Sequence, residues 1–237
     1  MAVPLEVVIL TGAGISAESG LSTFRCQDGL WENHRFEDVA TPEAFHRNPD
    51  LVQRFYNERR RHLLSQSVRP NAAHQAITEL QRRLRSRLTL VTQNVDHLHE
   101  AAGYDKPWHM HGELLKSRCL ECNQVTHCEE DLLPSSHCHA CQSKGRLRPH
   151  VVWFGETPLF LDEIQIRLQR CDVFLSIGTS GTVYPAAGFV QIAKLSGAQT
   201  IEINPETTEN NQHFEQSIRK TASQAVPTWI DSFLHQA

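Results

Sequence analysis

Four cysteines occur in two C-x-x-C pairs whose spacing suits a metal ion. Cys119 and Cys122 form the first pair and Cys138 and Cys141 the second, with 15 residues between the pairs. This spacing is typical of a tetrahedral zinc site made of four thiolates. Because four protein ligands leave no coordination position for water, the pattern predicts one structural zinc ion and not a catalytic one.

A glycine turn near the start of the chain has the residue types that bind phosphate. Residues 7–10 are continuously apolar, as in a buried parallel strand, and Gly12 and Gly14 follow directly. Glycines let the backbone turn tightly and approach a ligand. Residues 15–19 are predicted to begin a helix whose free N–H groups point back at the turn. The pattern indicates a dinucleotide pyrophosphate site, with a tight strand connection as the alternative.

The acidic residue that completes such a site in dehydrogenases is not evident. It should end a second strand about 20 positions after the glycines. Asp28 and Glu32 lie at that distance, but residues 26–31 do not resemble a strand. Other segments must therefore hold the rest of the nucleotide, and a hydride-transferring dehydrogenase fits poorly.

Polar side chains follow three further predicted strands, over residues 88–92, 173–177 and 200–203. In chain order, the residues that follow these strands are Gln93, Asn94 and Asp96; Gly178, Thr179 and Ser180; and Asn204, Pro205 and Glu206. The carboxyl ends of parallel strands face the ligand crevice, so we expect these side chains to lie together. The last group could hold ribose hydroxyls. Helix capping is the alternative role for Asn94 or Asp96.

His111 is the candidate for proton transfer. Histidine is the side chain best suited to exchange a proton near neutral pH. The chain has 14 histidines, so type alone selects none of them. The position of His111, directly before a glycine and the metal-binding module, distinguishes it.

Helical periodicity predicts the elements between the strands. Thr41 and Asn71 are expected to cap helices. The other predicted helices cover residues 50–65, 159–169, 185–195 and 226–234. On the first of these, Tyr56 and Arg59 are three residues apart and share a face. Spacing alone favours a core position for Tyr56 and a solvated basic face made of Arg54, Arg59, Arg60 and Arg61.

The alternation of strands and helices predicts an α/β fold with a doubly wound, Rossmann-like parallel sheet and an inserted small zinc-binding and helical domain. We expect the whole chain, 1–237, to form one catalytic unit. Its core would be residues 1–30, 71–111 and 151–237, and its small domain residues 31–70 and 112–150. The 237 residues, 40% of them hydrophobic, suffice for this organisation.

Charge and cysteine usage limit the classes of partner. The net charge of −4 gives no general attraction to nucleic acid, and no apolar run approaches the length of a membrane span. The first residues lack the features of a signal peptide. Paired C-x-x-C motifs among seven cysteines suggest metal binding in a reducing compartment, so we expect a cytoplasmic protein.

The motifs together resemble the sirtuin family of NAD-dependent protein deacylases. GAGIS-(x7)-FR, TQNVD, HMHGE, the paired C-x-x-C, PHVVWFGE, GTS and INPE occur in the family's order over nearly the whole chain. The short N-terminal segment and compact length resemble bacterial members. The segment FYNERR is similar to a branch in which a tyrosine and an arginine accept the carboxylate of succinyl-lysine, which favours Tyr56 and Arg59 as substrate-binding residues.

The resemblance implies roles for individual residues. His111 would be the general base, with Asn94 and Asp96 beside it in the catalytic pocket. Tyr56 and Arg59 would bind the acyl group, and Val151, Val152, Phe154, Gly155 and Glu156 would pair with an extended substrate peptide. The NAD-binding residues would be Gly12, Ala13, Gly14, Ser16, Glu18, Thr23, Phe24, Arg25, Trp31, Gln93, Asn94, Asp96, Gly178, Thr179, Ser180, Asn204, Pro205, Glu206 and Ala222. Cys26 departs from the family pattern in the cofactor loop.

The implied reaction consumes NAD as a co-substrate. The acyl-lysine oxygen attacks the ribose carbon that bears nicotinamide, and His111 then helps deprotonate a ribose hydroxyl. The products are free lysine, nicotinamide and O-acyl-ADP-ribose, from acetyl- and also succinyl- or malonyl-lysine. An ADP-ribosyltransferase that uses the same pocket and a nucleic-acid-binding zinc ribbon are the alternatives, although the net acidic charge disfavours the ribbon.

Overall fold

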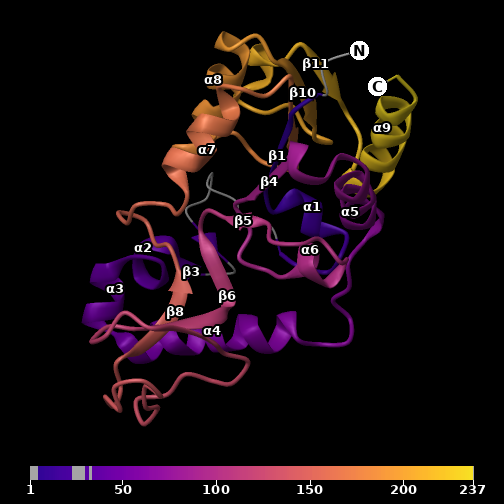
Figure 1. Ribbon diagram of the computed structural model, residues 1–237. Coiled ribbons are helices and arrows are strands. Elements are labelled where there is room, and N and C mark those ends of the chain that lie inside the picture. Colours follow the sequence, from indigo (N-terminus) through magenta and orange to yellow (C-terminus); the bar gives the residue numbers. More distant parts are fainter. Residues whose placement is uncertain (1–4, 23–29, 32–33, 237) are drawn as a thin grey trace.

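The computed structural model describes residues 5–22, 30–31 and 34–236, with side chains omitted at 30, 31 and 236. A six-stranded, fully parallel sheet lies at the centre of the larger part (Figure 1). Its strands, in spatial order, are β11 (Gln216–Ile218), β10 (Gln199–Ile203), β9 (Val173–Ile177), β1 (Val7–Thr11), β4 (Leu88–Thr92) and β5 (Trp108–His109). The chain winds outward from β1 in one direction and from β9 in the other, which confirms the doubly wound prediction.

Helices cover both faces of this sheet (Figure 1). On one face, α5 (Ala72–Leu84) and α9 (Ala222–Gln236) pack against each other and bury Ile77, Leu80 and Val226 over the strands. On the other, α7 (Leu161–Leu168) and α8 (Phe189–Leu195) bury Ile164 and Phe189. Strands β1, β4 and β9 are therefore buried along their whole length, which explains their continuous apolar runs.

Two insertions form the smaller part of the molecule. The first, between β1 and β4, contains the β2–β3 hairpin (Leu30–Trp31 and His34–Arg35) and helices α2 (Phe36–Val39), α3 (Pro42–Arg47) and α4 (Pro49–Leu63). The second, between β5 and β9, forms an antiparallel sheet of β7 (Val125–His127), β6 (Gly112–Cys119) and β8 (Leu147–Val151). A shared apolar cluster joins α4 to this sheet, so the prediction of a small inserted part with helices is confirmed, while its zinc binding stays a prediction.

Helix α4 corrects one sequence-based interpretation. Asn48 caps it, and Phe55 and Leu63 lie on its buried face. Arg60, expected on a solvated basic face, is completely buried. Its guanidinium donates to the carbonyl oxygens of Leu114 and Glu130 and to the Asn57 side chain. A cation at this depth is tolerated because carbonyl dipoles replace its hydration.

Other helix boundaries differ from prediction by a few residues. Helix α9 begins four residues earlier than expected and contains Pro227, a residue type that more often marks a helix start. Helix α8 starts at Phe189, because residues 186–188 form a 3-10 turn instead. Helix α1 (Gly14–Ala17) has only one turn. The Asn71 cap of α5 and the Thr41 cap of α3 are confirmed.

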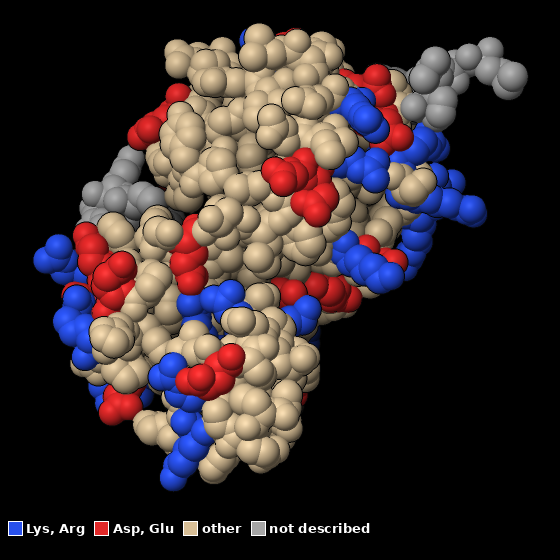
Figure 2. Space-filling model, turned by 60° about the vertical axis from the view of Figure 1, so that its left-hand side comes forward, with Lys and Arg blue, Asp and Glu red and all other residues tan. Residues whose placement is uncertain are grey.

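Surface charge and helix hydropathy bear on possible partners. Figure 2 shows Lys and Arg mixed with Asp and Glu on the face in view. In the described part of the chain, no helix combines the length and apolar character required to cross a membrane.

Candidate active site

One cavity of about 640 Å³ runs from the carboxyl edge of the parallel sheet into the smaller part of the molecule. It lies within the size range of small-molecule sites. Every predicted NAD-binding, catalytic or substrate-binding residue whose side chain is described lines this cavity. The sequence-based argument that strand ends converge on one crevice is therefore supported by where these residues lie. Their roles remain predictions.

The two glycine turns that follow β1 and β9 pack directly against each other at this edge. A Cβ on Gly14 would lie 2.7 Å from the Gly178 Cα atom, closer than such atoms approach in proteins. Gly178 also has a φ of +61°, in the left-handed region that favours glycine. Side chains at these positions would push the turns apart, so glycine keeps the strand ends close where the winding of the sheet reverses.

The sequence predicted free N–H groups after the first glycine turn as phosphate donors, and this detail is wrong because these N–H groups are already bonded. The N–H of Gly14 donates to the Gly178 carbonyl, and those of Ile15 and Ser16 donate within the turn itself. Helix α1 is also too short for a sizeable macrodipole. The turn therefore contributes shape and close approach rather than a helix end with free N–H groups.

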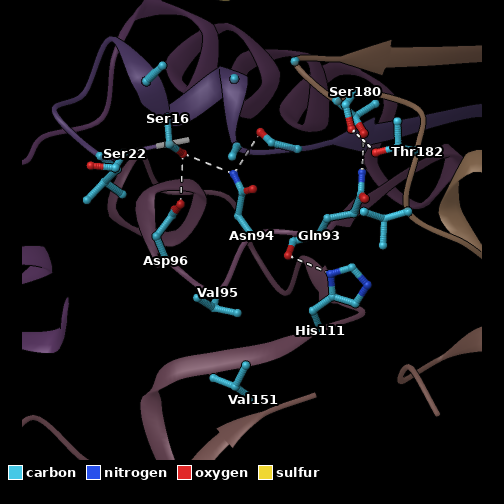
Figure 3. Close-up of a pocket in the computed structure, with 18 of the residues that line it drawn as sticks. Ser16, Ser22, Gln93, Asn94, Val95, Asp96, His111, Val151, Ser180 and Thr182 are labelled. Atoms are coloured by element: carbon cyan, nitrogen blue, oxygen red, sulfur yellow. Dashed lines mark hydrogen bonds between the residues drawn. The ribbon is translucent and has the colours of Figure 1, made fainter. Parts of the chain in front are cut away.

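The segment after β4 is hydrogen-bonded to both glycine turns (Figure 3). The Asn94 amide donates to the Gly12 carbonyl and the Ser16 hydroxyl, and that hydroxyl donates to Asp96 at 2.9 Å. On the other side, the Gln93 amide donates to the Thr179 hydroxyl. Burial raises the pKa of Asp96, although the Ser16 hydroxyl and the Leu98 N–H partly offset it. The capping alternative also holds, because Asp96 accepts the Leu98 N–H.

His111 faces the cavity directly after β5. Its Nδ1 donates to the Gln93 carbonyl oxygen at 3.0 Å, as Figure 3 shows. A carbonyl can only accept, so Nδ1 carries the hydrogen and Nε2 of the neutral ring keeps its lone pair. Burial lowers the pKa of His111, and the hydrogen bond to Gln93 opposes this shift only partly. The ring is therefore neutral and able to accept a proton near pH 7.

A second histidine, His109, was not singled out in the sequence analysis. It binds the Asn94 carbonyl, next along the chain to the Gln93 carbonyl that His111 binds. His109 Nδ1 donates to the Asn94 carbonyl at 2.9 Å, and its Nε2 lies 2.8 Å from Glu100 Oε1. Burial would lower the pKa of His109, but the Glu100 carboxylate raises it overall. The alternation His109-Met110-His111 could have indicated that both rings point to the same side.

The far end of the cavity is formed by the segments after β9 and β10 and by the start of α9. The Asn204 amide donates to the Thr179 carbonyl, joining these two strand ends. The Glu18 carboxylate accepts bonds from the Ser223 N–H and hydroxyl in the first turn of α9. Burial raises the pKa of Glu18, but the Ser223 bonds lower it overall. Glu18 thus ties α1 to α9, beside Ala222 of the cavity wall.

The opposite end contains Tyr56 and Arg59 of α4. Tyr56 is fully buried, and its hydroxyl accepts a hydrogen bond from Trp153 Nε1 at 2.9 Å. Arg59 Nη1 donates to the Phe55 carbonyl, and its guanidinium lies 3.1 Å from the Phe55 ring centroid. Both side chains line the cavity beside apolar neighbours such as Leu63 and Val151. An apolar channel that contains an arginine among its described residues suits an acyl chain that ends in an anion.

Residues 151–156, which are expected to pair with a peptide, have few backbone N–H groups left to donate to one. The N–H of Val152 donates to the backbone carbonyl of His111, and the N–H of Phe154 donates to the backbone carbonyl of Ala40. The N–H of Trp153 donates to the Glu156 carboxylate. These three N–H groups already have partners within the chain, and pairing of the stretch with a peptide stays a prediction. In the part of the chain that the structure describes, the Gly155 N–H has no such internal partner.

The four predicted metal-binding cysteines are brought together at the ends of β6 and β8. All four Sγ atoms lie within 4.8 Å of one another, and the pairs Cys119–Cys141 and Cys122–Cys138 are both 3.7 Å apart. Zn–S bonds of 2.3 Å at tetrahedral angles require about 3.8 Å between sulfur atoms. The donor set therefore fits zinc. All six cysteines of the described residues are free thiols.

Comparison with known proteins identifies the family. The Sir2 family model matches residues 12–185. The chain belongs to the Sir2 family. It is 57% identical over 229 residues to an NAD-dependent protein deacylase of Salmonella typhimurium, covering 97% of this chain and 84% of that protein.

Two solved structures extend the likeness to the whole fold. A Sir2 homologue in complex with NAD is 40% identical, with a TM-score of 0.87 over 97% of this chain and 90% of its own. A Sir2 structure with a p53 peptide and NAD+ is 28% identical, with a TM-score of 0.81 over 97% of this chain and 94% of its own.

Some residues expected in the Sir2 site lie outside what the structure describes. Thr23, Phe24, Arg25 and Cys26 belong to this group, as do Asp28 and Glu32. Trp31 is described only as part of β2, without its side chain.

Conversely, the cavity of this Sir2 chain includes residues that sequence reasoning missed, among them Ala40, His62, Leu114, Trp153, Thr182, Tyr184 and Thr208. Trp153 stood within the PHVVWFGE motif but was given no role of its own.

Proposed function

We propose that this Sir2 protein is an NAD-dependent protein-lysine deacylase. It removes acetyl and also succinyl or malonyl groups from an extended peptide, and it releases nicotinamide and O-acyl-ADP-ribose. The single observation that carries this proposal is the continuity of the cavity, which joins the glycine turns, His111 and the Tyr56–Arg59 end in one volume. A nucleotide and an acyl-lysine can therefore meet beside the same imidazole. The whole chain is proposed to act as one catalytic unit.

NAD would occupy the part of the cavity along the sheet edge. The packed turns at Gly14 and Gly178 would allow its phosphates to approach the backbone, and Asn204 and Glu206 of the cavity lining would bind adenosine hydroxyls. Gln93, Asn94 and Asp96 would surround the nicotinamide and its ribose. Their side chains are already fixed by hydrogen bonds, so little ordering is required when NAD binds.

His111 would act on the ribose of NAD once nicotinamide has left. Its Nδ1–H is held by the Gln93 carbonyl, so Nε2 is the atom that accepts the proton of a ribose hydroxyl. The deprotonated oxygen then attacks the acyl carbon, and water completes release of lysine. This fixed tautomer supports a general base, because a ring free to rotate would present either nitrogen.

The activity should persist to lower pH than an ordinary histidine would allow. Burial lowers the pKa of His111, so its neutral, proton-accepting form survives below the usual value of about 6.5. We expect kcat/KM for an acetyl-lysine peptide to stay level down to about pH 6.5 and to fall only below it. A half-maximal point above pH 7 in the kcat/KM profile would contradict this assignment.

The peptide and its acyl group would enter from the side of β8. The Gly155 N–H can pair with an extended peptide, while the acyl chain passes Val151 and Leu63 towards Arg59. The likeness to a Sir2 structure that contains a p53 peptide supports a protein substrate. The net charge of −4 and the mixed surface charge favour no nucleic-acid partner.

Product analysis tests the proposal directly. The protein is incubated with NAD and, separately, with acetyl-, succinyl- and malonyl-lysine forms of one peptide, and products are identified by mass. We expect free-lysine peptide, nicotinamide and O-acyl-ADP-ribose in equal amounts. ADP-ribose attached to protein without deacylated peptide would establish a transferase instead. Deacylation of acetyl-lysine only would overturn the proposed acyl range and leave the proposed deacylase activity standing.

Zinc is proposed to hold the wall of the acyl channel. Cys119 pairs with Leu147 at one end of the β6–β8 ladder, and Gly112 pairs with Val151 at the cavity end. Removing the metal should therefore loosen both ends. We expect about one zinc per chain, and its chelation should lower Tm by roughly 5 °C or more, the effect of about 2 kcal/mol at this size. Activity should fall with it and return with zinc.

The zinc content of variants provides the control. Cys171→Ser alters a buried cysteine outside the cluster and should retain the metal, whereas Cys138→Ser should lose it. Zinc-free protein with unchanged Tm would show that the metal has no structural role.

A further inference from the structure

Trp153 contacts the acyl end of the cavity through a single polar atom. Its side chain is buried, and its indole Nε1 donates a hydrogen bond of 2.9 Å to the Tyr56 hydroxyl. An indole N–H is a donor only, so Tyr56 must accept at this contact. The hydroxyl hydrogen of Tyr56 is therefore directed away from Trp153.

The indole is itself clamped by an ion pair in which the arginine is buried and the glutamate half-buried. Arg148 lies 3.4 Å from the Trp153 ring centroid and forms two hydrogen bonds, of 2.6 and 2.9 Å, with the Glu156 carboxylate. That carboxylate also accepts the Trp153 N–H at 2.8 Å. Backbone and ring of Trp153 are thus fixed at once. Burial raises the pKa of Glu156, but the Arg148 and Trp153 donors lower it overall, which keeps the clamp charged.

We propose that Trp153 is a specificity-positioning residue, whose indole N–H orients the Tyr56 hydroxyl so that it donates to a carboxylate-bearing acyl group. The inference rests on the proposed function and deepens it. Tyr56 and Arg59 both line the acyl end, so a terminal carboxylate there meets the guanidinium and the oriented hydroxyl together. A hydroxyl that accepts one hydrogen bond also donates more strongly.

The effect should depend on the acyl group. Hydrogen bonds to a charged acceptor are about twice as strong as neutral ones, and a succinyl carboxylate is such an acceptor. An acetyl group ends in a methyl and offers no acceptor at this position. Loss of the indole N–H should therefore reduce succinyl-lysine turnover far more than acetyl-lysine turnover, whereas loss of packing alone should reduce both alike.

The test compares kcat/KM for succinyl- and acetyl-lysine forms of one peptide. Trp153→Phe keeps an aromatic ring without the N–H, and replacement of Trp153 by benzothienylalanine keeps both rings with sulfur at that position. For each, we expect the succinyl-to-acetyl ratio to fall roughly tenfold, mainly through KM for the succinyl peptide. Trp108→Phe, a change on β5 outside the cavity lining, should leave the ratio unchanged.

A double-mutant cycle with Tyr56→Phe shows whether Trp153 acts through the hydroxyl. In the Tyr56→Phe background, Trp153→Phe should lower the ratio no further. Additive effects, an equal fall for both peptides or an unchanged ratio would each overturn the inference while leaving the proposed function intact. A wild-type protein inactive on succinyl-lysine would overturn the proposed acyl range as well, and this outcome is recognised before any variant is tested.

Discussion

A His111→Ala variant should lose deacylation almost entirely while it still folds and binds NAD. General acid–base groups contribute roughly 10²- to 10⁴-fold to rate, so kcat/KM for an acetyl-lysine peptide should fall by that range. His111 lines the cavity, and its Nδ1 is held by the backbone carbonyl of Gln93. The lost side chain leaves its partner, the Gln93 carbonyl, facing the cavity, so stability should change little.

The measurement pairs turnover with two controls. NAD affinity by calorimetry and Tm should both stay close to the wild-type values. His46→Ala alters an exposed histidine on α3 and should turn over the peptide normally. Near-normal turnover by folded, NAD-binding His111→Ala protein would remove the imidazole from the mechanism.

The sheet and most of the site could be predicted because their residues carry local signals. Strands buried on both faces read as apolar runs, and the polar residues after them, such as Asn94 and Asn204, then had to meet at one edge. The clustering of the four cysteines was predictable because the sequence spacing of two C-x-x-C pairs is typical of a tetrahedral zinc site.

Features that depend on long-range contacts were not predictable from local patterns. Arg60 looked solvated because helical spacing says nothing of the carbonyls of residues 114 and 130 that surround it. The Gly14 N–H is already bonded because the facing turn places the Gly178 carbonyl beside it, although Gly178 is 164 residues away along the chain. Trp153 received no role from the sequence because its hydrogen bond to Tyr56 joins residues that are 97 positions apart.

Acyl selectivity gives the second large expected effect, through Arg59→Met. A succinyl or malonyl carboxylate at the end of this apolar channel would lose its planar, bidentate partner, and methionine retains the length of the side chain without the charge. Leaving a buried charge unpaired costs about 2–5 kcal/mol. Since about 1.4 kcal/mol is one factor of ten, kcat/KM for succinyl-lysine should fall roughly 30-fold or more. Acetyl-lysine turnover should change by only a few-fold.

Two matched variants locate the effect at the guanidinium. Arg54→Met removes an exposed arginine from the same helix and should leave both turnovers unchanged, because Arg54 lies away from the cavity lining. Arg59→Lys keeps the charge but loses the planar fork, so it should recover only part of the succinyl activity. If Arg59→Met lowers both turnovers equally, the guanidinium supports α4 through its bond to the Phe55 carbonyl and not the substrate. If neither falls, the anion-binding end of the channel lies elsewhere.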